Sequence, residues 1–271
     1  MALRINYNLA SSSAQRGLGA SQDAYAKQAT RLSTGLRINS ASDDAAGMAV
    51  SEKLKNQVRG LNQAQRNAQD GISLIQTAEG GLVETHNILA RMRELAVQAS
   101  SDTLGTTDRA NLNAEFTQLT AEVTRIGNAT QFNGTYLLNN ATPSITLQIG
   151  ANTGDTLAVA LTNNTAAGLS LTGDVLSQST ASSAIANVDA AITTVSTNRA
   201  NLGALQSRLE SASRSLAVAA ENTAAANSRV ADADIASSMS ELVRAQILQQ
   251  AGISVLAQAN QAPSLVLQLL K

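Results

Sequence analysis

The sequence contains no cysteine and no tryptophan, and aromatic residues make up only 2% of its 271 residues. The absence of cysteine excludes a disulfide framework, a thiolate metal site and thiol chemistry. Proline occurs only twice. The hydrophobic residues, 44% of the chain, are therefore mostly aliphatic. Such side chains suit narrow contacts between helices better than a thick globular core.

The sequence also lacks an excess of charge of either sign, since its formal net charge is −1. This balance gives no electrostatic reason to expect nucleic acid or an acidic membrane surface as a partner. The first residues have no apolar signal core, because Arg4, Asn6, Asn8 and a run of three serines interrupt them. We therefore expect no cleaved signal peptide.

Motifs that carry catalysis are absent as well. The sequence has no zinc-protease motif, no phosphate-binding loop, no nucleophile elbow and no dinucleotide-binding glycine motif. The single histidine, His86, has no second histidine or cysteine with which to form a site. The pair Asp43 and Asp44 precedes an alanine-rich segment, where capping of a helix is favoured over acid–base chemistry. We expect no enzyme activity, no cofactor and no metal.

What the sequence does contain is a long heptad repeat between Val50 and Ala99. Its main row consists of Leu54, Leu61, Ala68, Ile75, Leu82, Leu89 and Ala96. Apolar residues at this spacing are typical of a long helix that packs against another helix. A second row of the same period, from Val188 to Val230, predicts the partner helix. Because a 50-residue helix is about 75 Å long, we expect an elongated bundle.

The remaining pattern predicts a mainly α chain with one small β-hairpin region. Helices are expected at about 1–34, 45–99, 108–127 and 182–227. Within 130–178, the pair Asn133-Gly134 indicates a turn. Apolar residues alternate at 145–149 and again at 157–161, which predicts a hairpin. No other strand pair is evident.

The C-terminal segment carries no charge between Arg244 and Lys271. When its residues are placed at 100° intervals, apolar groups cover the whole circumference of the helix. Such a helix either spans a membrane or is surrounded by protein. Its glutamine and asparagine side chains argue against a membrane span. Only the N-terminal helix is left in this chain as a partner, so we expect other copies to cover the rest.

Several segments resemble the sequence signatures of bacterial flagellin. Near the N-terminus these are LSTGLRIN at 32–39, DDAAGMA at 43–49, RGLN at 59–62, NAQDGIS at 67–73, RELAVQ at 93–98 and QFNG at 131–134. Near the C-terminus they are RANLGALQ at 199–206, AANSR at 225–229, DAD at 232–234, AQILQQAG at 245–252 and VLAQAN at 255–260. The resemblance covers both terminal regions in the right order and is far more specific than one short motif.

This resemblance implies a structural subunit that polymerises into the flagellar filament, a helical tube with a central channel that serves motility. Residues 1–44 and 231–271 would form the two halves of an inner, two-helix coiled coil. Residues 45–230 would form the outer rod domain, and the variable outer domains that many flagellins insert in mid-chain would be missing. The alternative is a hook–filament junction protein, which has similar ends. The polymerisation core is expected to include Ile5, Leu9, Leu18, Leu32, Leu242, Ile247, Leu248, Val255, Leu256 and Leu267.

The resemblance also implies partners and a location. The partners are other copies of the chain, the flagellar export apparatus with its chaperone, the filament cap and the hook-associated proteins. The location is extracellular, in the flagellum. Recognition by the host Toll-like receptor 5 would involve Arg91, Leu95, Gln98 and Glu115. The alternative interpretation of these four residues is solvated helix charge and helix packing.

Overall fold

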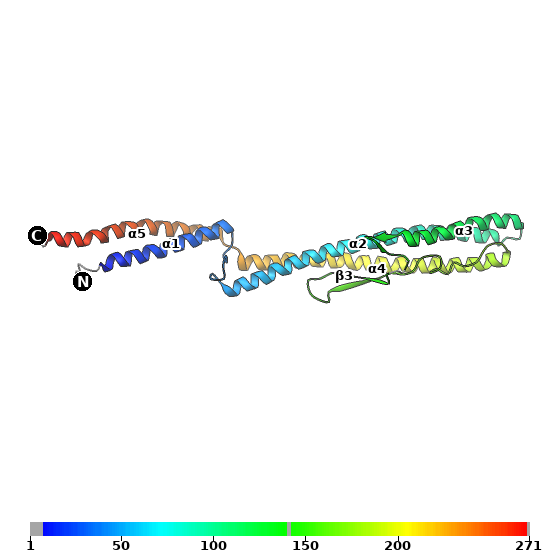
Figure 1. Ribbon diagram of the computed structural model, residues 1–271, viewed down its shortest axis with the longest axis horizontal. Helices are drawn as coiled ribbons and strands as arrows, with labels where there is room; N and C mark the ends of the chain where they lie inside the picture. The colour runs from blue at the N-terminus through cyan, green and yellow to red at the C-terminus, as the bar shows by residue number, and fades with distance from the viewer. Residues whose placement is uncertain (1–7, 140–141, 270–271) are drawn as a thin grey trace. The chain divides into compact units, whose positions relative to one another are not determined.

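The computed structural model describes residues 8–139 and 142–269, with side chains as far as Gln261. The described residues form five helices and two small antiparallel sheets (Figure 1). The helices are α1 (Leu9–Thr34), α2 (Ala45–Ala99), α3 (Thr106–Ala129), α4 (Gln178–Ala231) and α5 (Ile235–Leu269). The strands are β1 (Gln131–Phe132), β2 (Thr135–Tyr136), β3 (Ser144–Gln148) and β4 (Thr156–Ala160). The fold is the mainly helical one that the sequence predicts.

The chain divides into two compact units. The terminal unit comprises Met1–Gln57 and Asn222–Lys271, and the central unit comprises Val58–Glu221. The boundary between the two units falls within α2 and within α4. The domain boundaries that the sequence predicts, at 44/45 and 230/231, stay a prediction.

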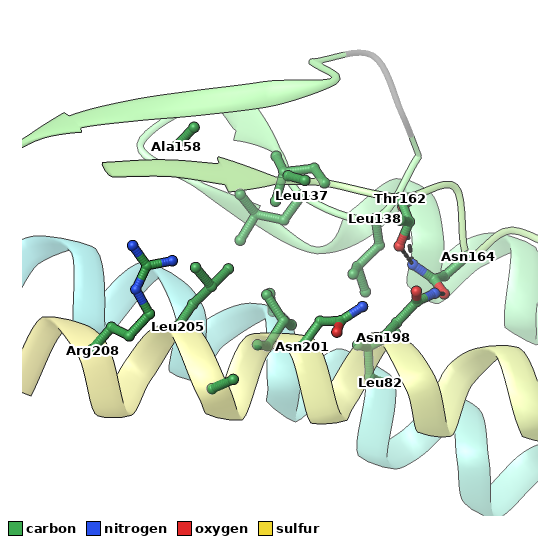
Figure 2. Close-up of a pocket in the computed structure, with 15 residues that line it drawn as sticks. Leu82, Leu137, Leu138, Ala158, Thr162, Asn164, Asn198, Asn201, Leu205 and Arg208 are labelled. Atoms are coloured by element: carbon green, nitrogen blue, oxygen red, sulfur yellow. Dashed lines mark hydrogen bonds between the residues drawn. The ribbon is translucent and has the colours of Figure 1, made fainter. Parts of the chain in front are cut away.

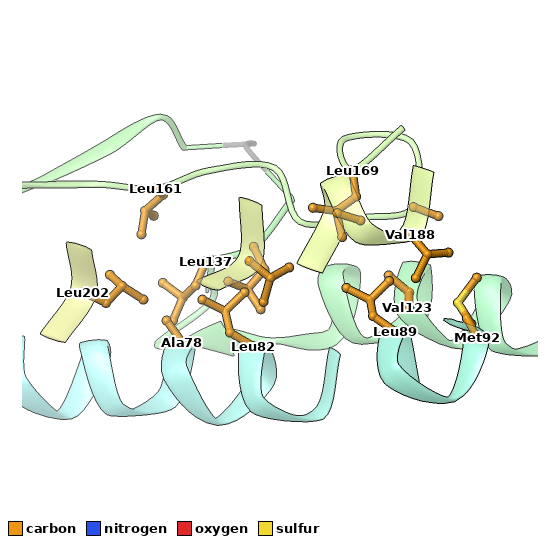
Figure 3. Packing of buried hydrophobic residues seen from close by; sticks show 14 of the residues in the cluster. Ala78, Leu82, Leu89, Met92, Val123, Leu137, Leu161, Leu169, Val188 and Leu202 are labelled. Carbon is orange, nitrogen blue, oxygen red and sulfur yellow. The ribbon is translucent and has the colours of Figure 1, made fainter. Parts of the chain in front are cut away.

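The core of the central unit is formed by the heptad residues of α2 and α4, together with residues of α3. Ile75 of α2 and Val195 and Leu209 of α4 are fully buried. Leu82 and Leu89 of α2 are also fully buried (Figure 3). Burial of one aliphatic side chain of this size contributes about 1.5–3 kcal/mol. The period of seven therefore marks the seam along which the long helices pack, as the sequence predicts.

A short turn reverses the chain between α2 and α3. The Arg109 guanidinium donates to the carbonyl oxygens of Ala99 at 2.9 Å and Ser101 at 2.8 Å, so it satisfies acceptors at the end of α2. The Asp108 carboxylate accepts from the backbone N–H of Gly105 at 3.2 Å, which fixes the start of α3. These contacts make α3 the antiparallel neighbour of α2.

Two glycines inside α2 are explained by close neighbours. A Cβ atom at Gly81 would lie 2.7 Å from Thr130 Oγ1 and 2.8 Å from Leu138 Cδ1. A Cβ atom at Gly71 would clash with Leu147 of the β3–β4 hairpin. At both positions glycine admits an element that packs directly on the helix backbone. The structure continues α2 through both residues without interruption.

The expected hairpin is confirmed as β3 and β4, in which Ile145 faces Val159 and Leu147 faces Leu157. A second strand pair, β1 and β2, was not predicted, because each strand has only two residues and shows no alternation. Its turn is the predicted one. Asn133 and Gly134 both have positive φ angles, of 48° and 78°, as a tight two-residue hairpin requires.

Candidate assembly surface

The terminal unit is built on α1 and α5, which run antiparallel. Near the start of α1, the Asn8 side-chain amide donates to the carbonyl oxygen of Ala259 at 2.8 Å. Further along, Gly252 of α5 lies against Leu18, where a Cβ atom would be 3.5 Å from Leu18 Cδ1. That distance is an ordinary van der Waals contact, so α1 and α5 lie directly against each other at this point.

A tight connection holds the other end of the helix pair. Gly35 ends α1 in the left-handed conformation, with φ at 71°, and its backbone N–H donates to the carbonyl oxygen of Arg31. The next residue, Leu36, forms an antiparallel β-bridge with Asp232, the residue after α4. The backbone N–H of Arg37 donates to the carbonyl oxygen at the end of α4 at 2.7 Å. Backbone hydrogen bonds thus join the segment that follows α1 to the segment that follows α4.

The two aspartates before α2 have separate structural roles. The Asp44 carboxylate accepts from the backbone N–H of Gly47 at 2.8 Å and caps the helix. The Asp43 carboxylate contacts Lys27 Nζ of α1 at 2.7 Å and accepts from the backbone N–H of Ser40. The hydrogen bond from Lys27 is the main cause that lowers the pKa of Asp43 from 3.8 to about 2. The pair therefore organises the connector, as the capping interpretation expected.

Large apolar side chains of the terminal unit remain in contact with solvent. Helix α1 has no buried residue at all. These exposed apolar residues, each 37–65% exposed, are Leu9, Tyr25, Val50, Ile235, Met239, Val243, Ile247, Leu248, Ile253 and Val255. On α5, only Ser238 and Ala245 are buried among the residues whose side chains are described. One neighbouring helix therefore covers one side of α5 and leaves the rest open.

Charge is sparse on α5. Glu241 and Arg244 are its only charged residues, and they form an ion pair with each other at 3.0 Å. An exposed apolar surface with so little charge is typical of a site that another protein covers. The geometry of the terminal unit therefore favours assembly.

The structure places the residues predicted for the polymerisation core in two groups. Four are exposed, namely Leu9, Ile247, Leu248 and Val255, and four are half-buried, namely Leu18, Leu32, Leu242 and Leu256. Ile5 and the side chain of Leu267 lie outside the described residues. The prediction omitted Tyr25, Ile235, Met239, Val243 and Ile253, which are also exposed. Four of these residues, Ile235, Met239, Val243 and Ile253, lie on α5. The distribution of apolar residues around the whole circumference of that helix is the signal that could have predicted them.

The four residues implied in receptor recognition occupy different environments. The Arg91 guanidinium bonds Glu115 of α3 at 2.9 Å and Glu94 of its own helix at 2.9 Å. These carboxylates, Glu115 first, raise the pKa of Arg91 above its ordinary value. Gln98 is exposed, whereas Leu95 is fully buried in the core. The structure thus brings Arg91 and Glu115 together on the surface and places Leu95 beneath it.

The described residues contain no group of three His, Asp or Glu side chains that could hold a metal ion. His86 is half-buried, and its Nδ1 atom has no hydrogen-bond partner in the described part of the chain. Over the same residues, no helix combines the length and the apolar character that crossing a membrane requires.

Comparison with known proteins identifies the family. Residues 5–142 match the bacterial flagellin N-terminal helical region, and residues 185–270 match the bacterial flagellin C-terminal helical region. A flagellin of Halalkalibacterium halodurans is 48% identical over 98% of this chain and 99% of its own length. A flagellin of Bacillus subtilis is 43% identical over 99% of this chain and the whole of its own length.

A solved structure agrees with these matches. The crystal structure of Bacillus cereus flagellin is 34% identical and superimposes with a TM-score of 0.51. The superposition covers 56% of this chain and 88% of that one. The stretch between the two family matches is short, at 143–184, and leaves no room for large inserted domains.

Proposed function

Because this chain belongs to the bacterial flagellin family, we infer that it is a structural subunit of the bacterial flagellar filament. The filament is extracellular and is built from copies of one chain, so the main partner of each subunit is another copy. The alternative of a hook–filament junction protein is not favoured, because both terminal regions match flagellin itself. The family is structural, and we propose that this chain likewise has no catalytic role.

The observation that carries the proposal is the exposed apolar surface of the terminal unit. Ile247, Leu248, Ile253 and Val255 are each more than half exposed. Because about half of each side chain is already covered, each would contribute roughly 1 kcal/mol if a neighbouring subunit removed the rest from water. Several such side chains per subunit, repeated along a polymer, contribute to offsetting the cost of association.

We propose that the terminal unit corresponds to the inner part of the filament and the central unit to the outer part. The part of α5 that follows Arg244 carries no charged residue, which suits the lining of a channel through which further subunits pass, because it offers no fixed charge to hold them. The ten residues of the predicted polymerisation core remain our proposal for the contacts between subunits. The four further α5 residues that are exposed, Ile235, Met239, Val243 and Ile253, join them.

The remaining partners follow from family membership. We propose that the flagellar export apparatus and its chaperone handle the chain before assembly. The filament cap and the hook-associated proteins would then contact its two ends in the polymer. A chaperone that covers the exposed apolar surface would prevent premature association of copies, since that surface is open in the single chain.

Removal of α5 tests the function directly. A chain truncated after Val230 should remain helical but should form no filaments under conditions in which the full chain assembles, as seen by electron microscopy. Filaments of normal length from the truncated chain would overturn the proposal.

A point substitution separates assembly from folding. Leu248→Asp places a charge on the exposed apolar surface without removing the helix, so it should block assembly and leave the circular dichroism spectrum of the monomer unchanged. Ser196→Asp, at an exposed site on α4, is the matched control and should assemble normally.

Recognition by Toll-like receptor 5 is a second proposal. The exposed Arg91–Glu115 pair supports it, because the pair presents both charges on one face of α2 and α3. We propose that Leu95 contributes by packing beneath the pair, since it is buried. Arg91→Ala should reduce receptor signalling by soluble protein, whereas Arg125→Ala, which breaks a similar pair with Glu122 on α3, should not. Equal signalling by both variants would contradict this assignment.

A further inference from the structure

A groove of about 360 Å³ lies in the central unit between the β3–β4 hairpin and α4 (Figure 2). Its floor is aliphatic and includes Leu82, Leu137, Leu138, Leu161 and Leu202. Its α4 wall carries three polar side chains, Asn198, Asn201 and Arg208, and Figure 2 shows Arg208 pointing toward the hairpin. This combination of an apolar floor and a few polar groups is typical of a binding site.

The opposite wall of the groove is a free strand edge. The backbone N–H of Leu161 donates to Pro143 at 3.0 Å, and that of Ile149 donates to Asp155 at 2.9 Å. In an antiparallel ladder, the residues that exchange hydrogen bonds with β3 then include Leu157 and Val159. The N–H and C=O groups of the alternate residues, which include Ala158 and Ala160 at the groove, point away from β3. The groove therefore offers backbone donors and acceptors as well as an apolar floor.

The charged group in the groove has no partner within the chain. Among the described residues, Arg208 makes no ion pair or hydrogen bond, although Arg91, Arg93, Arg125, Arg199 and Arg244 each pair with a carboxylate. Figure 2 shows no carboxylate among the residues that line the groove. An unpaired guanidinium beside a free strand edge favours an occupant with a carboxylate in a loop.

One loop of the same chain offers such a carboxylate. The carboxylates outside the helices of the described part are held locally, by Lys27 for Asp43 and by nearby backbone N–H groups for Asp44, Asp155, Asp174 and Asp234, while Asp232 accepts from Ser228. Asp102 alone makes no such bond. It lies exposed in the turn between α2 and α3. Its carboxylate is therefore open to solvent in the single chain.

We propose that the α2–α3 turn of a neighbouring copy occupies this groove in the filament, with its Asp102 carboxylate on the Arg208 guanidinium. The inference rests on the proposed function, since it requires copies packed side by side. The free edge of β4 would supply hydrogen bonds to the backbone of the turn. The contact joins two different surfaces, so it repeats from copy to copy without closing on itself.

Charge exchange tests the pairing of these two residues in the full-length chain. Arg208→Asp and Asp102→Arg each place like charges together, and each should raise the critical concentration for assembly roughly tenfold or more. The double variant restores opposite charges and should assemble at close to the wild-type concentration. Arg214→Asp, which changes an exposed arginine of α4 outside the groove, is the control and should assemble like the wild type.

Chemical labelling gives a second readout, because the chain has no cysteine of its own. Asn201→Cys should react readily with a maleimide in the monomer and at least several-fold more slowly in the filament. Equal reactivity in the two forms overturns the groove proposal, as does failure of the double variant to recover. If the wild-type chain forms no filament at all, the proposed function fails instead. The two failures are therefore distinguishable.

Discussion

The central and terminal units differ in how far they bury aliphatic residues of their long helices. Leu82 and Leu89 of α2 are fully buried, whereas Ile247 and Leu248 of α5 are 59% and 52% exposed. All four are aliphatic residues of long helices. The difference lies in the number of neighbours, because α3, α4 and the hairpin share one core with α2, while α1 is the described neighbour of α5 in its unit. A helix that is apolar on more faces than its neighbouring helices cover requires further partners.

The comparison predicts its largest effect on the stability of the monomer. Leu89→Ala should lower the free energy of unfolding by about 2–5 kcal/mol, because it leaves a cavity in a closed core. Leu248→Ala should change it by less than about 0.5 kcal/mol, because the side chain is already in water. Urea denaturation of the two full-length variants measures both. A large loss from Leu248→Ala would show that the terminal unit has a closed core of its own.

The same two substitutions should reverse their order when assembly is measured. Leu248→Ala should raise the critical concentration about fivefold, which corresponds to the loss of roughly 1 kcal/mol of burial between copies, because the side chain is half-exposed in the monomer. Sedimentation of filaments from serial dilutions gives this value. An unchanged critical concentration would mean that Leu248 stays exposed in the filament.

Two adjacent glycines of α2, Gly80 and Gly81, test how closely the core of the central unit is packed. Gly81→Ala should destabilise the monomer by about 1–3 kcal/mol, because its methyl group meets Thr130 and Leu138. Gly80→Ala has nothing within 4 Å and should stabilise the protein by up to about 1 kcal/mol, since alanine is the better helix former. Thermal unfolding of the two variants measures the difference. The same sign for both would contradict the close packing seen at Gly81.

The smallest effect concerns pH and the connector of the terminal unit. Because Lys27 lowers the pKa of Asp43 from 3.8 to about 2, the ionised carboxylate stabilises the folded unit above about pH 4. This contribution should decline as the pH falls toward 2. Asp43→Asn should therefore show a flatter dependence of stability on pH between 4 and 2 than the wild type. Parallel curves for the two proteins would exclude a role for the pair.

The sequence predicted the long helices well because a heptad row is a strong and repeated signal. Helix α2 runs from Ala45 to Ala99, as expected. Helix α4 runs from Gln178 to Ala231, a few residues beyond the expected 182–227 at each end, and its C-terminal end includes Val230, the last residue of the apolar row. Its start is set by the Ser177 hydroxyl, which accepts from the backbone N–H of Thr180.

Local patterns could not predict features that depend on a third element. Leu95 lies off the main heptad row, yet it is buried, because the core also includes Phe116 and Val123 of α3. A resemblance between sequences likewise does not say which residues are buried. It therefore could not show that Leu95 is buried and Arg91 is exposed. The strands β1 and β2 are too short to show alternation. The groove beside β4 depends on how the hairpin packs on the helices, which no local pattern records.

Hydrogen exchange tests the central claim most directly, namely that copies of the chain complete the terminal unit. We predict that the backbone amides of α5 exchange rapidly in the monomer and slowly in the filament, whereas those around Leu82 and Leu209 exchange slowly in both. Strong protection of α5 in the isolated monomer, unchanged on assembly, would contradict the account.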